Sequence, residues 1–239
     1  MESRPKPVEA PVWMRDERRR RPALTREAIV AAAIKIADEE GPEAVSIRRV
    51  ASELGARAMS IYSHIDRKED LINLMADEVS GEILIGEGEM PANWREALTK
   101  ISHLTRAAMV RHPWLIHMAG KRTEWGPNAL RHIEQSLAAL DSLDVDTETA
   151  ISVIAAVDHF VLGCVRMEII DKMSQERFGM SHDERLMTML DYLRGQAEEN
   201  GLTRLGKALE EKVHRPKSVG FDRGLSWLLD GIERDLVRD

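Results

Sequence analysis

The sequence has little of what disulfide frameworks, thiolate metal clusters and β-sheets require. It contains one cysteine, and aromatic residues make up 4% of its 239 residues. One cysteine can form neither an internal disulfide nor a thiolate cluster, and Cys164 lies in the apolar run 160–165, where we expect a buried, inert thiol. Because strand-forming aromatics are scarce while alanine, leucine, glutamate and arginine are plentiful, the composition predicts an all-α protein.

Signals for export, membrane insertion and catalysis are also missing. The sequence shows no signal-peptide pattern and no long uninterrupted apolar span, so we expect a cytoplasmic protein that does not enter a membrane. No G-x-S-x-G, Walker, HExxH or CxxC motif occurs. The histidines His112, His117, His132 and His159 are scattered without metal-ligand spacing. We therefore expect no enzyme activity, no cofactor and no bound metal.

The net charge of −7 argues against a nucleic-acid partner, but the charges are unevenly distributed. Residues 71–239 hold 20 Lys+Arg against 28 Asp+Glu, whereas residues 1–70 hold 14 against 13. Salt screens charges beyond about 8–10 Å, so local positive charge at a docking surface outweighs the total. Residues 1–23 carry four prolines and an arginine run, and we expect a flexible arm there. Either a solubilising tail or an arm that contacts DNA fits this composition.

Residues 24–70 show the helical spacing of apolar residues three times in succession, which predicts a small helical domain. A first helix is capped by Thr25 and ends at the following glycine–proline pair. A second helix is capped by Ser46, and Gly55 allows the left-handed turn that ends it. A third helix begins near Ala58 and includes Ile65. Two short helices joined by a glycine turn, over residues 47–65, are typical of a helix-turn-helix.

The remaining residues, 71–239, predict a larger helical domain. Asp66 and Glu69 form a capping box for a fourth helix. The helix that follows Asp146 is apolar almost all round, so we expect it to be buried on several sides. The stretch 171–181 is polar and predicts a loop, and the stretch 203–219 is only weakly patterned. Further helices are predicted over 94–110, 127–143, 147–169, 182–199 and 221–237.

The third predicted helix has a face suited to reading DNA. Its inward positions are apolar, whereas Ser60, Ser63 and His64 face outward and Arg57 stands at the turn. The ring of Tyr62 can pack while its hydroxyl reaches a phosphate. Lys68 opposes the dipole of the fourth helix, which a nearby phosphate would compensate.

The stretch 51–72 resembles the DNA-binding signature of TetR-family regulators. The resemblance rests on the Leu54-Gly55 turn, on the aromatic-x-His pattern at Tyr62 and His64, and on Lys68 ahead of an aliphatic pair. It implies that the family's DNA contacts fall on Arg48, on four residues of the third helix and on Lys68. The full predicted DNA-binding set is Thr25, Ser46, Arg48, Arg57, Ala58, Met59, Ser60, Tyr62, Ser63, His64 and Lys68.

The C-terminal part resembles the ligand-binding and dimerisation domain of tetracycline repressors, at residues 157–165 and 221–236. The resemblance implies two domains and a homodimer. Gly224 and Gly231 are one heptad apart, and each costs about 1 kcal/mol of helix stability, which close helix–helix approach would offset. Packing within one chain is the alternative explanation for these glycines. The predicted dimer contacts are Phe160, Gly224, Leu228, Gly231 and Ile232.

The same resemblance implies a small-molecule pocket, but not the magnesium-binding set of tetracycline repressors. His117 matches the metal-binding histidine, whereas Leu84 and Ile101 replace polar contacts and Met167 replaces a glutamate. A single imidazole is a poor site for a hard cation. A mostly apolar pocket suits an aromatic or polyketide-like organic ligand, although each of these residues is also a plausible core residue. The predicted ligand-binding set is Ile101, Thr105, Met109, His117, Ile133, Ser136, Ile151 and Ile154.

These observations predict a ligand-responsive transcriptional repressor that binds a palindromic DNA operator as a homodimer and is released by a small organic inducer. A DNA-binding activator or regulator without a small-molecule ligand is the alternative. The predicted divisions are an arm at 1–23, a helix-turn-helix domain at 24–70 and a ligand-binding and dimerisation domain at 71–239.

Overall fold

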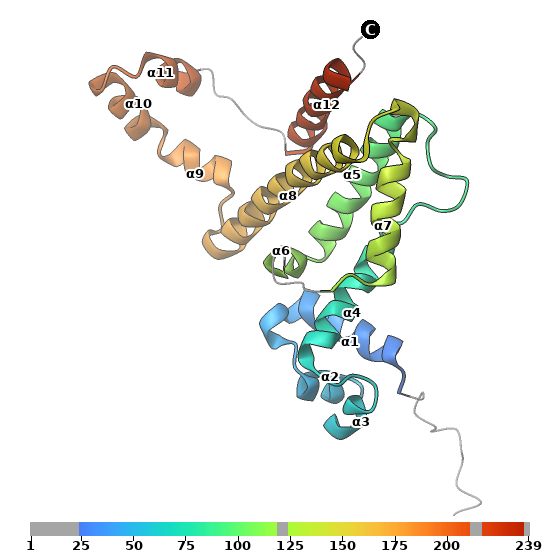
Figure 1. Ribbon diagram of the computed structural model, residues 1–239. Coiled ribbons are helices and arrows are strands. Elements are labelled where there is room, and N and C mark those ends of the chain that lie inside the picture. The colour runs from blue at the N-terminus through green and yellow to red at the C-terminus, as the bar shows by residue number, and fades with distance from the viewer. Residues whose placement is uncertain (1–23, 119–123, 211–216, 237–239) are drawn as a thin grey trace, which may run out of the picture.

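The computed structural model describes residues 24–118, 124–210 and 217–236, and these residues form helices and connecting loops with no strand (Figure 1). The arm predicted at 1–23 lies outside the described residues. The prediction of an all-α protein is confirmed for the described part. The helices are α1 (Arg26–Glu40), η3 (Pro42–Ala44), α2 (Ile47–Glu53), α3 (Ala58–Tyr62), α4 (Lys68–Gly81), α5 (Trp94–Arg111), α6 (Trp114–Met118), α7 (Pro127–Ala138), η4 (Asp141–Leu143), α8 (Thr147–Phe178), α9 (His182–Thr188), α10 (Leu190–Glu199), α11 (Thr203–Glu210) and α12 (Lys217–Leu236).

Helices α1, α2 and α3 and the first turns of α4 form a compact unit, which we call the reading head (Figure 1). The caps are those that the sequence predicts, because Thr25 accepts the Ala28 N–H at 3.1 Å and Ser46 accepts the Arg49 N–H at 3.2 Å. Gly55, at φ +60°, ends α2 as expected. The helix α3 is shorter than predicted and stops at Tyr62, but Ile65 is still buried beneath it.

The start of α4 differs from the predicted capping box. Its N-cap is Arg67 rather than Asp66, and the Asp70 carboxylate, not that of Glu69, accepts the Arg67 N–H at 3.1 Å. The side chains of Arg67 and Asp70 also form an ion pair of 3.0 Å, which adds to this cap. The capping pattern occurs in two registers one residue apart, and the arginine–aspartate pair favours the second.

The core of the reading head continues beyond residue 70. Leu71, Met75 and Val79 of α4 are buried in it, and Trp114 of α6 joins them. The helix α4 therefore links the head to the rest of the chain, as Figure 1 shows. The domain boundary at residue 70 stays a prediction.

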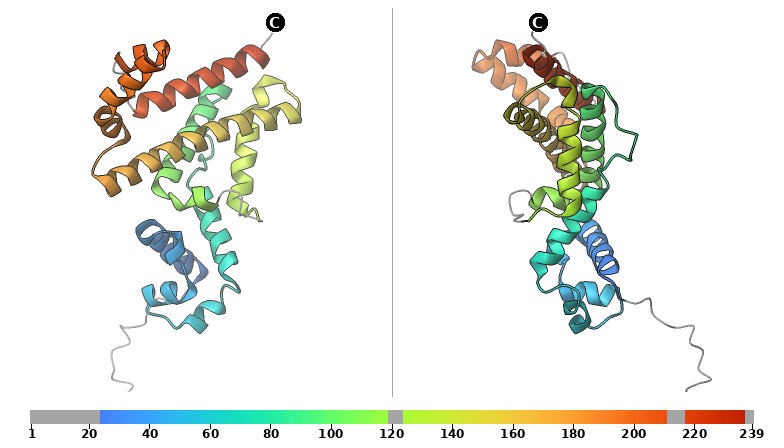
Figure 2. Two further views of the ribbon diagram at one scale, coloured as in Figure 1. Left: turned by 90° about the vertical axis from the view of Figure 1, so that its left-hand side faces the viewer. Right: turned by 45° about the vertical axis from the view of Figure 1, so that its right-hand side comes forward.

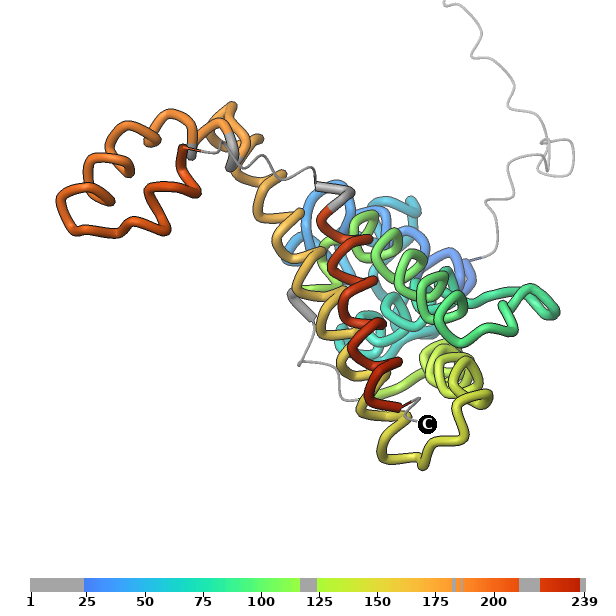
Figure 3. The backbone as a smooth tube through the Cα atoms, turned by 90° about the horizontal axis from the view of Figure 1, so that it is seen from above, coloured from blue at the N-terminus to red at the C-terminus, as the bar shows by residue number. Residues whose placement is uncertain are grey.

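Helices α5, α7, α8 and α12 form the C-terminal domain, with α12 lying along α8 (Figure 3). Two predicted elements are corrected here. The helix α7 ends at Ala138 and a separate turn, η4, follows, instead of one helix over 127–143. The predicted loop at 171–181 is wrong, because α8 continues to Phe178 and ends at Gly179, whose φ is +67°. A polar stretch on an exposed helix face keeps its helical preference, so polarity alone does not mark a loop.

Burial of α8 on several sides was also a wrong expectation for the single chain. Its buried residues form one stripe, from Ala150 through Val157 to Val165. On its outer side Ile151, Met167 and other large apolar residues are exposed. Among the described helices, α8 is the one that by length and composition could cross a membrane, contrary to our reading of the sequence. In the structure this helix packs against α5 and α12.

Helices α9, α10 and α11 project away from the body as an arm that starts at the end of α8 (Figure 2). The single helix predicted over 182–199 is broken at Met189, which separates α9 from α10. The weakly patterned stretch contains α11, and α12 begins at Lys217, earlier than predicted.

Candidate DNA-binding and ligand-binding sites

The outer surface of the reading head carries most of the predicted DNA contacts. Ile61 and Ile65 are buried and hold α3 against the head, so the opposite side of α3 faces solvent. Met59 of α3 is 77% exposed and Tyr62 is 46% exposed. The exposed members of the predicted set are Thr25, Arg48, Arg57, Met59, Ser60, Tyr62 and Ser63, while Ser46, Ala58, His64 and Lys68 are partly buried.

The arginines of the head fall into two classes that the sequence did not separate. Arg49 pairs with Glu40 at 2.5 Å and with Glu53 at 2.9 Å, which joins α2 to α1. Its neighbour Arg48 is exposed and, like Arg57 and Lys68, forms no ion pair with another described residue. The three cations predicted to contact DNA, Arg48, Arg57 and Lys68, are therefore unpaired in the described part.

Hydroxyl groups in the head differ in whether their proton is free for a phosphate. Ser46 accepts a backbone N–H group, which leaves its hydroxyl proton available to donate, whereas the Thr25 hydroxyl accepts a backbone N–H and also hydrogen-bonds the Glu27 carboxylate. Ser63 instead donates to the Ser60 carbonyl at 2.8 Å, so its proton is already used. Ser63, which was predicted to face outward on the DNA-reading side, is exposed but has no free hydroxyl proton to donate.

A residue that the sequence analysis missed lies beside His64. The guanidinium of Arg26, at the start of α1, donates to the His64 carbonyl at 3.4 Å. This contact places an exposed cation next to the end of α3. A basic residue in the first turn of a helix opposes the helix dipole, which was the available sequence signal.

The predicted ligand-binding residues divide into buried and outward groups. Ile101 and Ser136 are buried, and Met109, Ile133 and Ile154 are partly buried. Ile151 is 55% exposed and faces outward, so its predicted place in an internal pocket is corrected. The side chain of His117 lies outside the described residues.

Thr105 stands out among them because its hydroxyl is buried and has no hydrogen-bond partner. A buried hydroxyl without a partner costs about 1–3 kcal/mol, so such groups are rare unless a ligand or water satisfies them. Ser136, by contrast, donates to the His132 carbonyl at 2.8 Å. Of the predicted ligand-binding residues with described side chains, only Thr105 has a hydroxyl without a hydrogen-bond partner.

His132 is a second polar group near this region and was not predicted. The Gln135 Oε1 accepts the Ile85 N–H at 3.0 Å, so the amide nitrogen of Gln135 faces His132 Nδ1, at 3.1 Å. Burial lowers the pKa of His132, which favours the neutral ring. The ring therefore accepts at Nδ1 and keeps its hydrogen on Nε2.

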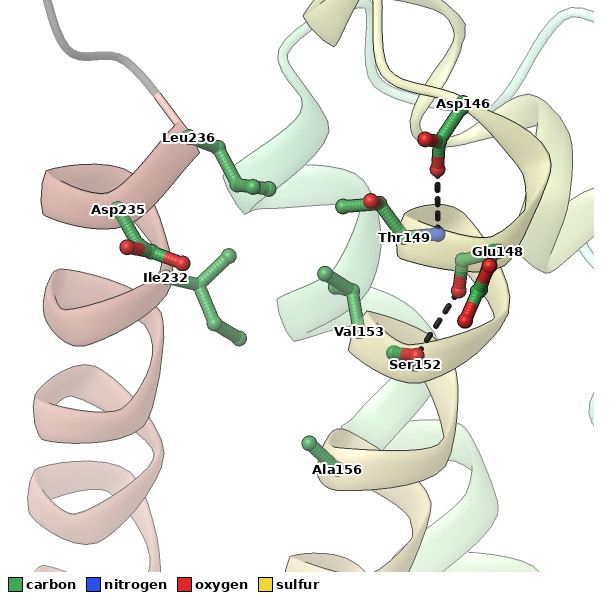
Figure 4. A pocket seen from close by; sticks show the side chains of 9 residues that line it. All are labelled: Asp146, Glu148, Thr149, Ser152, Val153, Ala156, Ile232, Asp235 and Leu236. Carbon is green, nitrogen blue, oxygen red and sulfur yellow. Dashed lines mark hydrogen bonds between the residues drawn. The ribbon is translucent and has the colours of Figure 1, made fainter.

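Cavities of the described part include one on each half of α8. One, of about 380 Å³, lies between the start of α8 and the end of α12, where Thr149 and Val153 face Ile232 and Leu236 (Figure 4). The other, of about 670 Å³, lies between the end of α1 and the second half of α8 and is lined in part by Trp114 and Met173. The predicted ligand-binding residues do not line either of them.

The residues of α8 do not fit the magnesium site of tetracycline repressors. Glu168 is next to the expected glutamate position. Its carboxylate accepts hydrogen bonds from Nε and Nη2 of Arg106, each at 2.9 Å. No group of three potential ligands for one cation occurs among the described side chains. The nearby Cys164 is partly rather than fully buried, which corrects the expectation of a buried thiol. Desolvation, with a smaller contribution from Glu168, raises the pKa of this thiol.

The two glycines of α12 have different surroundings. A Cβ on Gly224 would lie 2.8 Å from ring atoms of Phe160, so this glycine and Phe160 are explained by packing within the chain. Leu228 and Ile232 also pack partly against their own core. A Cβ on Gly231 would meet no atom within 4 Å. Trp227, on the same helix, is 64% exposed.

Comparison with known proteins matches both parts of the chain. Residues 29–75 match the family described as "Bacterial regulatory proteins, tetR family", and residues 87–236 match "Tetracyclin repressor-like, C-terminal domain". The HTH-type transcriptional repressor DrrR1 of Streptomyces coeruleorubidus is 32% identical over 224 residues, which cover 92% of this chain and 81% of that protein.

More distant relatives include proteins with named ligands. The tetracycline repressor protein class E of Escherichia coli is 24% identical over 61% of this chain and 69% of its own length. The structure of the TetR family protein ActR of Streptomyces coelicolor in complex with actinorhodin has 25% identity and a TM-score of 0.70, and the match covers 90% of this chain and 99% of ActR. The chain therefore belongs to the TetR family of bacterial transcriptional regulators, with a helix-turn-helix domain followed by a tetracycline-repressor-like C-terminal domain.

Proposed function

We propose that this TetR-family repressor binds a palindromic operator as a homodimer in the cytoplasm and is released by a small organic inducer. The observation that carries the proposal is the exposed surface of the reading head. There Arg48, Arg57 and Lys68 have no ion-pair partner in the described part, while Arg49 is neutralised by two glutamates. Unpaired cations beside an exposed recognition helix are suited to phosphates and base edges.

The homodimer is proposed from the outer faces of α8 and α12. Ile151, Met167 and Trp227 are exposed there, and Gly231 leaves room for a close approach. An exposed apolar face of this kind marks a contact with another protein. Pairing these faces in two copies would bury them, and the same pairing accounts for the apolar length of α8 without a membrane. A two-fold dimer presents two heads, which matches an inverted repeat in DNA.

The inducer is proposed to be a polycyclic aromatic compound that binds beside α5 without a metal. The unused Thr105 hydroxyl supplies a polar anchor, and partly buried Met109 and Ile133 supply apolar contacts. ActR, a relative, is described with actinorhodin. Since Glu168 is already held by Arg106, magnesium would lack an acidic ligand on this part of α8. Regulation without a ligand is the second candidate, because Ile101 and Ile154 also pack in the core.

Replacing Lys68 by alanine tests the DNA-binding proposal. We expect the variant to bind operator and unrelated duplexes more weakly by similar factors, because a phosphate contact carries no sequence information. The slope of log affinity against log salt should fall by about one. Gel-shift titrations at several salt concentrations measure both. Lys100→Ala, which removes the same charge from α5, is the matched control and should leave the affinity and the salt slope unchanged. If Lys68→Ala also left both unchanged, the DNA contact would lie elsewhere.

Replacing Thr105 by valine tests the ligand proposal. Without ligand, the variant should unfold at the same temperature as the parent or higher, because a methyl group replaces an unsatisfied buried hydroxyl of equal shape. The affinity for the probe ligand, actinorhodin, should fall by roughly tenfold for a lost hydrogen bond of about 1.4 kcal/mol. Calorimetric titration measures this, with and without a chelator. Binding that is equal in parent and variant, or that requires magnesium, would contradict the proposed site.

A further inference from the structure

The helices α4 and α7 are joined by a side chain with no assigned role. The Asp77 carboxylate, on α4, accepts the backbone N–H of Ala129 at 3.0 Å, in the first turn of α7. The backbone carbonyl of Asp77 also accepts a hydrogen bond from the side-chain amide of Asn128, at 3.2 Å. A carboxylate at a helix N-terminus is favoured by the helix dipole as well as by the hydrogen bond. Asp77 therefore acts as a cap for α7 although it belongs to another helix.

The chain around this contact leaves no room for movement of the carboxylate. A Cβ on Gly126 would lie 2.3 Å from the Asp77 carboxyl carbon. Gly126 has φ −82° and ψ 176°, a backbone conformation that any residue adopts. The glycine is thus required for space rather than for conformation. On the other side, a Cβ on Gly81 would lie 3.1 Å from the Asn128 amide.

A second attachment holds the two helices together beyond the end of α4. The Gln135 side chain on α7 donates to the Ile83 carbonyl at 3.1 Å and accepts the Ile85 N–H at 3.0 Å. The two attachments are six residues apart on each segment, at Asp77 and Ile83 and at Ala129 and Gln135. Helices fixed at two separated points move together, because neither can slide or rotate without breaking hydrogen bonds.

We propose that Asp77 is a positioning residue that couples α7 to the DNA contact at the other end of α4. Lys68 lies nine residues before Asp77 on the same helix, about 13 Å along its axis. Ile133 and Ser136, on α7, belong to the predicted ligand-binding set, so a ligand that displaces α7 also displaces Lys68. This last step rests on the proposed function, whereas the coupling between α7 and the DNA contact is independent of any ligand.

Thermodynamic reciprocity allows the coupling to be tested with DNA alone. If α7 and the reading head move together, operator binding must change the equilibrium for local unfolding of α7, which hydrogen exchange reports. The probe is a duplex selected from random sequence by the purified full-length protein. Hydrogen exchange of backbone amides at 130–138 is measured with and without this duplex. We expect exchange there to slow by roughly 5- to 150-fold on DNA binding in the parent protein, the range of a typical allosteric coupling.

The variants separate coupling from stability. Asp77→Ala should reduce the DNA-dependent change at 130–138 to less than about twofold while operator affinity stays within roughly threefold, because the DNA contacts are intact. Gly126→Ala should act in the same way, since its methyl displaces the carboxylate without removing it. Asp77→Asn keeps an acceptor oxygen and should retain the change. Asn73→Ala, which removes an exposed contact of 3.4 Å between α4 and Glu124, is the matched control and should also retain it.

Operator affinity is measured first on each protein, so loss of DNA binding and loss of coupling are separate results. The proposal would be overturned if hydrogen exchange at 130–138 in the parent protein were the same with and without DNA. It would also be overturned if Asp77→Ala and Gly126→Ala both showed the same DNA-dependent change in exchange as the parent protein. Neither result would affect the proposed operator binding or the proposed ligand site.

Discussion

Replacing Asp38 by alanine is expected to lower the free energy of unfolding by about 3 kcal/mol and the melting temperature by roughly 10 °C. The Asp38 carboxylate accepts the Trp114 indole N–H at 2.7 Å and contacts His112 Nδ1 at 2.8 Å. Trp114 and His112 are both buried, so alanine leaves two polar groups without a partner or water. Asp38 lies on α1, His112 caps the end of α5 and Trp114 begins α6. The loss therefore falls on the attachment of the reading head.

Glu39→Ala is the matched control for this prediction. It removes an exposed carboxylate from the next position of α1, and should shift the melting temperature by less than about 2 °C. Asp38→Asn, whose amide oxygen still accepts one hydrogen bond, should fall between the two. Thermal unfolding followed by circular dichroism measures all three. Equal melting temperatures for Asp38→Ala and Glu39→Ala would show that the network contributes nothing to stability.

Gly231→Leu is expected to give a folded monomer at micromolar concentration. The position is open in the single chain, where a Cβ would meet no atom within 4 Å, but in the proposed dimer a leucine forces the paired helices apart. Overpacking costs about 1–3 kcal/mol per site, and two-fold symmetry applies it twice, so the dimer should weaken by about 4 kcal/mol, roughly a thousandfold. Operator affinity should fall with it, because a monomer engages one half-site only.

Gly231→Ala separates size from helix propensity. Both substitutions remove the cost of a helical glycine, of about 1 kcal/mol, but alanine adds a single methyl group. The alanine variant should therefore stay dimeric and melt at the parent temperature or above. Sedimentation equilibrium gives the association state of each protein. A dimer that survives Gly231→Leu would move the interface away from this part of α12.

Local patterns were sufficient to predict the reading head. Thr25 and Ser46 are short-range caps, and the buried residues of α1 and α2 recur at helical spacing, so each helix is specified by neighbouring residues. The capping box of α4 was placed one residue early because Asp66 and Arg67 both precede an acidic residue by three positions. Only the ion pair between Arg67 and Asp70 distinguishes the two registers.

Features that join distant parts of the chain were not predictable from such patterns. The contact of Asp38 with His112 spans 74 residues, and the cap that Asp77 provides for α7 spans 52. Likewise, the pairing of Arg49 with Glu53 follows the i,i+4 spacing of one helix, but its pairing with Glu40 depends on how α1 and α2 pack. Exposure of Ile151 depends on how α8 packs, which its apolar composition does not determine.

Footprinting on the selected duplex tests the central claim most directly, because it reports how many heads are bound and where. The proposed dimer should protect two half-sites related by two-fold symmetry, with centres about one helical turn, or a small multiple of it, apart. Addition of an inducer should release both together. Full-affinity protection of a single asymmetric half-site would contradict the account of this protein as a dimeric repressor.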